Sequence, residues 1–239
     1  MTQLFSTFTD GDDVIFGDEM NNLIQGGAGN DYLSGQGGDD TLDGGTGDDE
    51  IIGGDGADLI TGGDGTDTIL AGSGDDTING GDNTGFEWIF GDAGNDVINA
   101  GAGDDFVSGD AGADTVSGST GHDIIYGGTG DDVLDGGAGN DILVGDPGND
   151  TLSGGEGADA FDFSVGFDST GSTTWGDDVI TDFDPTEDFL SVAVFNGDAN
   201  LLTVVDTTEG ALVSYNGTSS ILVMGVNAGD LSIETYFGF

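Results

Sequence analysis

Carboxylates recur at a fixed spacing through the middle of this chain and are its main candidates for chemistry. From residue 26 to residue 162 a nine-residue pattern, Gly-Gly-x-Gly-x-Asp-x-aliphatic-x, occurs in fifteen copies, interrupted only by a two-residue insertion at Asn83 and Thr84. The sixth position is Asp in fourteen copies and Glu87 in the other. Oxygen ligands on glycine-rich turns suit Ca²⁺, which takes roughly six to eight oxygens, backbone carbonyls among them. The spacing therefore predicts rows of calcium sites.

The candidate metal ligands are the sixth-position aspartates and the corresponding Asp of one later, isolated copy. They are Asp31, Asp40, Asp49, Asp58, Asp67, Asp76, Asp96, Asp105, Asp114, Asp123, Asp132, Asp141, Asp150, Asp159 and Asp178. Glu87 is not among them, because its longer side chain and the adjacent insertion do not allow a metal site to be predicted for that turn.

The other positions of the repeat predict how these carboxylates are held. The fourth position is Gly in every copy, which indicates left-handed backbone angles or close backbone approach. The eighth position is aliphatic or aromatic throughout, from Leu33 to Phe161. One inward residue per copy predicts a three-residue strand after each six-residue turn, so two copies return the chain to the same side. The prediction is an all-β fold, a right-handed parallel β-roll solenoid closed by a C-terminal antiparallel β cap.

Such a roll has a core too small to fold by itself. The stacked turns also place one carboxylate above another, which is repulsive unless a cation lies between them. The chain has 48 acidic residues and neither Lys nor Arg, a composition typical of disorder. We therefore expect the calcium-free chain to be unfolded.

The tandem pattern resembles the signature of the RTX (repeat-in-toxin, haemolysin-type) calcium-binding proteins, as in GGAGND at residues 26–31 and again at 136–141. The resemblance implies that each ion lies between copies two apart, held by sixth-position carboxylates and turn carbonyls, with about a dozen ions in all. It also implies an uncleaved C-terminal signal, type I secretion machinery as a partner, and folding outside the cell.

Five copies depart from glycine at the second position, and we expect these changes to be tolerated because that position would ligate through its carbonyl. The departures are Gln36, Asp92, Asp110, Ser119 and Asp146.

Three regions follow from the repeat. Residues 1–25 are predicted to be an N-terminal cap with degenerate repeats, residues 26–162 the calcium-binding RTX β-roll, and residues 163–239 a closing repeat, a C-terminal β cap and the secretion signal. Strands of the last region are expected at 189–195, 201–206, 211–215, 221–224 and 231–237.

Composition excludes several classes of function. Without Lys or Arg the chain cannot neutralise phosphates, so nucleic acids and anionic membranes are excluded as partners, and no apolar stretch is long enough for membrane insertion. His122 is the only His, no HExxH or Gly-x-Ser-x-Gly motif occurs, and we expect no enzymatic activity. His122 itself is predicted to be an exposed turn residue.

Alternate copies should build opposite sheets, and their outward seventh and ninth positions differ. One face is mostly apolar: Val14, Phe16, Tyr32, Ile52, Leu70, Trp88, Phe90, Phe106, Ile124, Tyr126, Ile142 and Val144. The other is mostly polar: Thr41, Asp43, Thr61, Thr77, Asn79, Asn99, Thr115, Ser117, Thr151 and Ser153. An apolar row this long should be covered, either by the C-terminal region or by a second protomer. The candidate interface residues are Tyr32, Trp88, Phe90, Phe106 and Tyr126.

The function favoured by these patterns is that of a calcium-folded, secreted extracellular protein with a structural or self-assembling role at a surface or in a matrix. The alternative is a carbohydrate-binding or adhesion module without catalytic activity, which would need a cleft. An ice-binding face would need regular Thr and Asn at the third and fifth positions, and these are mixed.

Overall fold

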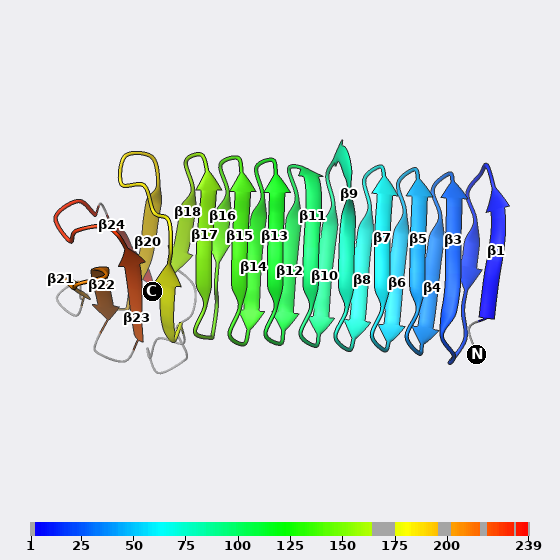
Figure 1. Ribbon diagram of the computed structural model, residues 1–239, viewed down its shortest axis with the longest axis horizontal. Helices are drawn as coiled ribbons and strands as arrows, with labels where there is room; N and C mark the ends of the chain where they lie inside the picture. The colour runs from blue at the N-terminus through cyan, green and yellow to red at the C-terminus, as the bar shows by residue number, and fades with distance from the viewer. Residues whose placement is uncertain (1–2, 164–174, 196–201, 216–218, 232, 239) are drawn as a thin grey trace.

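The solenoid is present as predicted. A computed structural model describes residues 3–163, 175–195, 202–215, 219–231 and 233–238 of the chain (Figure 1). Within these ranges every regular element is a β-strand, and the strands wind into a parallel β-solenoid of about eight turns. From β1 to β20, successive strands alternate between two sheets, so that each strand pairs in parallel with the strand two places along the chain.

The first sheet contains thirteen of the described strands. In spatial order they are β1 (Gln3–Thr9), β3 (Asn22–Ala28), β5 (Thr41–Thr46), β7 (Leu59–Asp64), β9 (Thr77–Gly85), β11 (Val97–Gly103), β13 (Thr115–Thr120), β15 (Val133–Ala138), β17 (Thr151–Glu156), β19 (Asp177–Ile180), β23 (Ser219–Met224), β22 (Gly210–Tyr215) and β21 (Leu202–Asp206).

The second sheet contains eleven of the described strands. They are β2 (Val14–Phe16), β4 (Tyr32–Gly37), β6 (Glu50–Asp55), β8 (Thr68–Ser73), β10 (Trp88–Ala93), β12 (Phe106–Ala111), β14 (Ile124–Thr129), β16 (Ile142–Val144), β18 (Ala160–Phe163), β20 (Phe189–Phe195) and β24 (Ile233–Gly238).

Most strands of the roll are six residues long, twice the predicted length, because a second residue of each strand also faces inward. In β5, both Leu42 and Gly44 are buried. The second inward residue is at the first position of the next copy, which is Gly or Ala in every copy and so adds nothing to the apolar pattern. A Cβ on Gly44 would collide with the carboxylate of Asp49, so this position has to be small.

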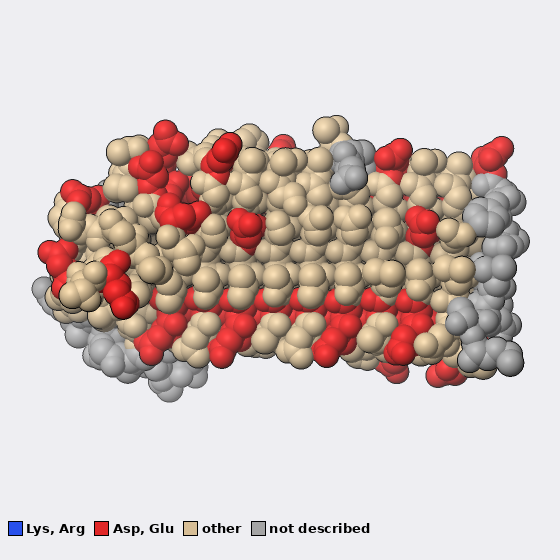
Figure 2. All heavy atoms as spheres, viewed as in Figure 1, with Lys and Arg blue, Asp and Glu red and all other residues tan. Residues whose placement is uncertain are grey.

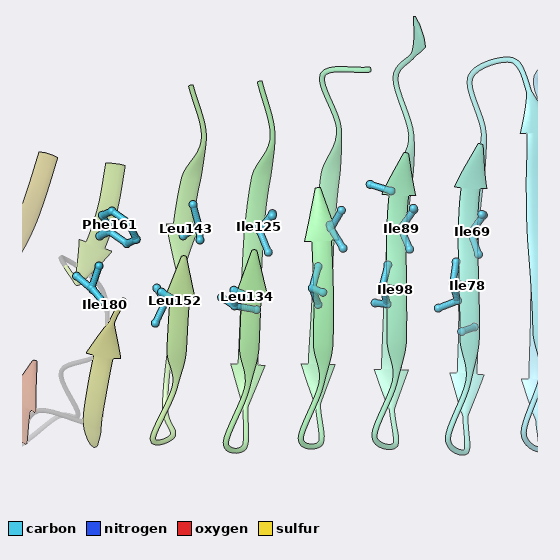
Figure 3. Packing of buried hydrophobic residues seen from close by; sticks show 14 of the residues in the cluster. Ile69, Ile78, Ile89, Ile98, Ile125, Leu134, Leu143, Leu152, Phe161 and Ile180 are labelled. Atoms are coloured by element: carbon cyan, nitrogen blue, oxygen red, sulfur yellow. The ribbon is translucent and has the colours of Figure 1, made fainter. Parts of the chain in front are cut away.

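The core is formed by the eighth position, as predicted. These side chains are almost completely buried from Ile24 to Phe161 and continue with Ile180 and Leu190. Figure 3 shows them as two facing rows between the sheets, one from each sheet. The N-terminal degenerate copies take part, since Ile15 is 8% exposed and Ile24 is fully buried.

The parallel stack continues past residue 162 into the C-terminal region. β19 pairs in parallel with β17, β20 with β18, and β24 with β20, while only β21, β22 and β23 pair antiparallel. The described C-terminal strands therefore extend the end of the solenoid (Figure 1) and do not fold back over its outer face. Of the two expected covers for the apolar face, the C-terminal one is not found among them. In the described ranges no helix is long and apolar enough to span a membrane.

Candidate calcium sites

The sixth-position carboxylates lie in two columns, one along each row of turns. All fifteen predicted ligands belong to these columns, and none is more than 3% exposed. In Figure 2 acidic side chains form a row along one edge of the visible face, and the chain has no Lys or Arg to offset them. The sequence spacing of one Asp per copy is thus converted by the fold into two stacks of carboxylates.

One oxygen of each carboxylate is engaged by the backbone. The N–H of Asp31 donates to Oδ1 of Asp49 at 2.8 Å, and the N–H of Asp49 donates to Oδ1 of Asp67 at 2.8 Å. The second column repeats this, with the N–H of Asp114 bound to Oδ1 of Asp132 at 2.8 Å. These bonds fix the side chains two copies apart in register and hold their second oxygens inside the turns.

The second oxygen, Oδ2, is buried without a hydrogen-bond partner in every one of the fifteen predicted ligands. A buried carboxylate oxygen without a partner is strongly unfavourable, and one such atom per turn cannot be explained as an isolated defect. A cation at each turn would satisfy these oxygens.

Backbone carbonyls approach the same oxygens. A Cβ on Gly26 would meet Oδ2 of Asp31 and the carbonyl oxygen of Gly44, two copies further on. Among the described residues no group of three or more His, Cys, Asp or Glu side chains could hold a metal. Backbone carbonyls would complete the coordination of an ion held by the column carboxylates. A set of carboxylate and carbonyl oxygens on glycine-rich turns fits Ca²⁺ and does not fit zinc or copper.

Burial makes the calcium-free columns electrostatically unfavourable. It raises the pKa of Asp49 to about 7, of Asp123 to about 7 and of Asp150 to about 8, with neighbouring carboxylates adding to the effect. Each of these groups is stabilised by a proton at low pH or by a cation at neutral pH.

Glu87 interrupts one column. Both of its carboxylate oxygens are buried without a partner, so it does not accept the backbone bond that an Asp accepts at this position. Its own N–H still donates to Oδ1 of Asp105 at 3.0 Å. Burial, followed by the nearby Asp105 and Asp67 carboxylates, raises the pKa of Glu87 to about 9. The Glu87 turn, for which the sequence predicts no metal site, therefore differs in hydrogen bonding from the neighbouring turns.

One member of the column was missed by the sequence analysis. Oδ1 of Asp188 accepts the N–H of Asp159 at 3.0 Å, which places Asp188 in the sixth position of the next coil. The signal was present, since Asp188, Phe189 and Leu190 match positions six to eight, but a long interruption separates them from the tandem copies.

A second ladder, also missed, runs along the exposed fifth position. The N–H of Asp48 donates to Oδ1 of Asn30 at 3.1 Å, and other Asp and Asn residues repeat this contact. His122 is exposed as predicted, but its Nδ1 also accepts the N–H of Asn140 at 2.7 Å. The fifth position therefore orders the outside of the turns.

The five non-glycine residues at the second position of the repeat have the left-handed backbone conformation that glycine normally adopts. They are the described non-glycine residues with positive φ: Gln36 (75°), Asp92 (66°), Asp110 (68°), Ser119 (73°) and Asp146 (65°). Gln36 and Ser119 keep their place in the strand ladder, paired with Gly54 and Gly101. The ladder skips the Asp92 and Asp110 pair between β10 and β12, and β16 ends at Val144, before Asp146.

The candidate interface residues fall into two groups on the second sheet. Ring centroids are 5.1 Å apart for Trp88 and Phe106, 5.7 Å for Phe90 and Phe106, and 5.6 Å for Phe106 and Tyr126, so four residues form one cluster. Tyr32 lies on β4, three strands from the cluster's edge at β10, and packs against Phe16 with ring centroids 5.6 Å apart.

The contrast between the two outer faces is smaller than the sequence analysis stated. Leu59, Val97 and Val133 are 48%, 51% and 47% exposed on the first sheet, because the seventh position there alternates between Thr and an aliphatic residue. Among the side chains that the structure describes, the exposed aromatic rings of the strands lie on the second sheet, at Phe16, Trp88 and Phe189.

The RTX calcium-binding nonapeptide repeat model matches most of the described roll, in overlapping segments. They are residues 9–42, 16–51, 34–69, 52–84, 82–116, 108–143 and 135–169. The chain belongs to this family. The RTX repeat thus accounts for the periodic carboxylates, the glycine-rich turns and the calcium-type oxygen donors in one motif.

Solved structures similar to this RTX chain include two subunits of the Azotobacter vinelandii mannuronan C5-epimerase in solution. Each is 26% identical; one match covers 58% of this chain and 78% of the subunit with a TM-score of 0.35, and the other covers 75% and 94% with a TM-score of 0.32. The extracellular lipase LipA of Serratia marcescens is 20% identical over 95% of this chain and 40% of the lipase, with a TM-score of 0.37. No curated protein sequence matches the chain.

Proposed function

We propose that this RTX protein is an extracellular structural component that folds when it meets calcium outside the cell and then assembles through the outer face of its second sheet. The observation that carries the proposal is the column of buried Oδ2 atoms without partners. A polypeptide that buries one unpaired carboxylate oxygen per turn needs a cation at each turn to be stable.

The calcium requirement favours an extracellular location. The carboxylates are shared between coils, so each ion would connect copies two apart, and about a dozen ions would bind during folding. Millimolar calcium, the concentration that weak extracellular modules require, is found outside the cell. We infer export through type I secretion machinery, with the chain unfolded during passage and folded on arrival.

A non-catalytic role is part of the proposal. The acidic side chains of the columns are engaged in the turns, and a single exposed His122 offers neither a zinc-binding pair nor a nucleophile-activating base. The residues with unusual chemistry are thus explained by cation binding.

The assembly surface is the aromatic cluster of Trp88, Phe90, Phe106 and Tyr126. Trp88 is 43% exposed, and from β2 to β16 the seventh and ninth positions of the second sheet hold one acidic residue, Glu50, while Asp92 and Asp110 lie beyond the cluster at the second position on β10 and β12. Because the sixth-position carboxylates lie at the turns, two such faces can meet without bringing the acidic columns together. A second copy of the chain is the occupant that we propose, with the aromatic cluster at the centre of the interface.

The test is the mass of the calcium-loaded protein in solution. Light scattering should show a dimer or larger species, and Trp88→Asp and Phe106→Asp should each return it to a monomer with the calcium midpoint unchanged. Val133→Asp, at an exposed position of the first sheet, is the matched control and should leave the mass unaltered. A monomer at every concentration would reject the assembly proposal and leave calcium-driven folding intact.

A further inference from the structure

A cleft of about 640 Å³ opens on one row of turns, at the site of the two-residue insertion. It is lined by four successive turns of that row and includes Thr66, Thr84, Phe86, Asp104 and Thr120. The end of β9 extends beyond the neighbouring turns at this point (Figure 1). The insertion lengthens one repeat, since the N–H of Asp76 binds Oδ1 of Asp96 across 20 residues where 18 is the rule. The cleft is therefore a consequence of a local departure from the repeat.

The walls of the cleft combine one aromatic ring with hydroxyl groups and a carboxylate. Phe86 is 37% exposed and its ring packs against Trp88, with centroids 5.2 Å apart and planes tilted by 59°. Oδ1 of Asp104 accepts the N–H of His122 at 2.9 Å, which orients that carboxylate. Other copies of the repeat place small or polar residues where Phe86 stands. An exposed ring is thus held at the rim of the cleft by a second ring below it.

We propose that this cleft binds a neutral saccharide. The C–H face of a pyranose ring packs well against an aromatic face, while Thr hydroxyls and a carboxylate can hydrogen-bond its hydroxyl groups. The volume lies within the range of about 300 to 1,000 Å³ that is typical of small-ligand sites. Anionic sugars are disfavoured, because the chain has no Lys or Arg and the acidic turns flank the cleft.

The inference is independent of self-assembly. The cleft lies on the turns, whereas the proposed interface lies on the outer face of the second sheet, and the Phe86–Trp88 ring contact joins them. A saccharide site on one edge would give the folded roll a means of attachment to a glycan-containing surface.

The test uses the full chain, loaded with calcium. Isothermal titration calorimetry and saturation-transfer NMR would be run with four neutral probes, namely cellotetraose, maltotetraose, mannotetraose and chitotetraose, and with tetragalacturonate as the anionic comparison. At least one neutral probe should bind with a Kd between about 0.1 and 5 mM, and tetragalacturonate should bind at least about tenfold more weakly.

Two variants locate the site. Phe86→Ala should weaken binding at least about tenfold, and deletion of residues 83–84, which restores the regular repeat, should abolish it; both should keep the parent's calcium-driven folding. Phe16→Ala, which removes an exposed ring on β2 away from the cleft, is the matched aromatic control and should bind as the parent does. Failure of all four neutral probes to bind, unchanged binding by Phe86→Ala, or equal affinity for tetragalacturonate would overturn the proposal.

Discussion

Asp132 lies in the middle of the second carboxylate column and is the sharpest place to test ligation. Its side chain is 1% exposed, Oδ1 accepts the N–H of Asp114, and Oδ2 is buried without a partner. Asp132→Ala should remove a ligand shared by two ions and leave the Asp114 N–H unpaired. The unpaired N–H of Asp114 alone lowers the free energy of unfolding by about 1 to 3 kcal/mol.

The expected shift in the calcium midpoint is modest because many ions share the transition. A penalty of about 3 kcal/mol distributed over about a dozen ions changes the midpoint roughly 1.5-fold, and the loss of two ions raises the total to about two- to threefold. The steepness of the transition should fall as well, since fewer ions bind in it. Asp132→Asn keeps the acceptor at Oδ1 and should still raise the midpoint, because it removes the charge.

The matched control is in the same turn. Asp131→Ala removes an equal charge from the exposed fifth position, where Asp131 accepts two bonds from Asn149 at 2.9 Å and water can replace it. The assay is far-ultraviolet circular dichroism during a calcium titration, with the number of bound ions measured by calorimetry. Equal midpoints for Asp132→Ala and the parent, or equal shifts for Asp131→Ala and Asp132→Ala, would refute the ligand assignment.

Two further predictions concern pH and backbone strain. Burial raises the pKa of Asp132 to about 6 and of Asp150 to about 8, above the ordinary 3.8, so the calcium-free roll should be most stable near pH 4 and should lose that stability as the pH rises to about 8. Calcium competes with the protons for these carboxylates and should therefore bind more tightly as the pH rises over the same range. A calcium midpoint that does not change with pH would contradict this prediction. Asp110→Gly should stabilise the calcium-loaded protein by about 0.5 to 1 kcal/mol in denaturant unfolding, because Asp110 has a φ of 68° that glycine adopts freely. A loss of stability would show that the contacts of the Asp110 side chain contribute more than the relief of backbone strain.

Much of the architecture could be predicted from the repeat because each position of the pattern has one physical task. The eighth position marks the core by its apolarity, and the sixth marks the carboxylate columns, so Leu33 and Asp31 lie where their types require. The alternation of copies between two sheets follows from the same period. The last predicted strands also coincide closely with β20 to β24.

What the pattern missed was signalled weakly or not at all. The inward first position carries only Gly or Ala, so Gly44 gave no apolar signal and the strands were predicted too short. The fifth-position ladder is made by Asp and Asn that look like solvating charge, and the bond accepted by His122 depends on a backbone N–H that comes from the next coil. β24 was expected in the antiparallel cap, yet it pairs in parallel with β20, a long-range choice that local alternation does not encode.

The cleft could not be predicted, because it results from packing around an insertion. The sequence locates the two extra residues and Phe86, but not the way four turns surround them. The break in the column at Glu87 lies in the same turn, so a single irregular copy changes both the metal column and the surface.

The central claim is that calcium completes this fold through the sixth-position carboxylates. The most direct measurement is the far-ultraviolet circular dichroism spectrum of the purified chain in excess chelator and then in rising calcium, with the bound ions counted at saturation. The account predicts a disordered spectrum in chelator and a cooperative change to β structure at about 10⁻⁴ to 10⁻³ M calcium, with about a dozen ions bound. A spectrum already rich in β structure in chelator, or only one or two ions at saturation, would contradict it.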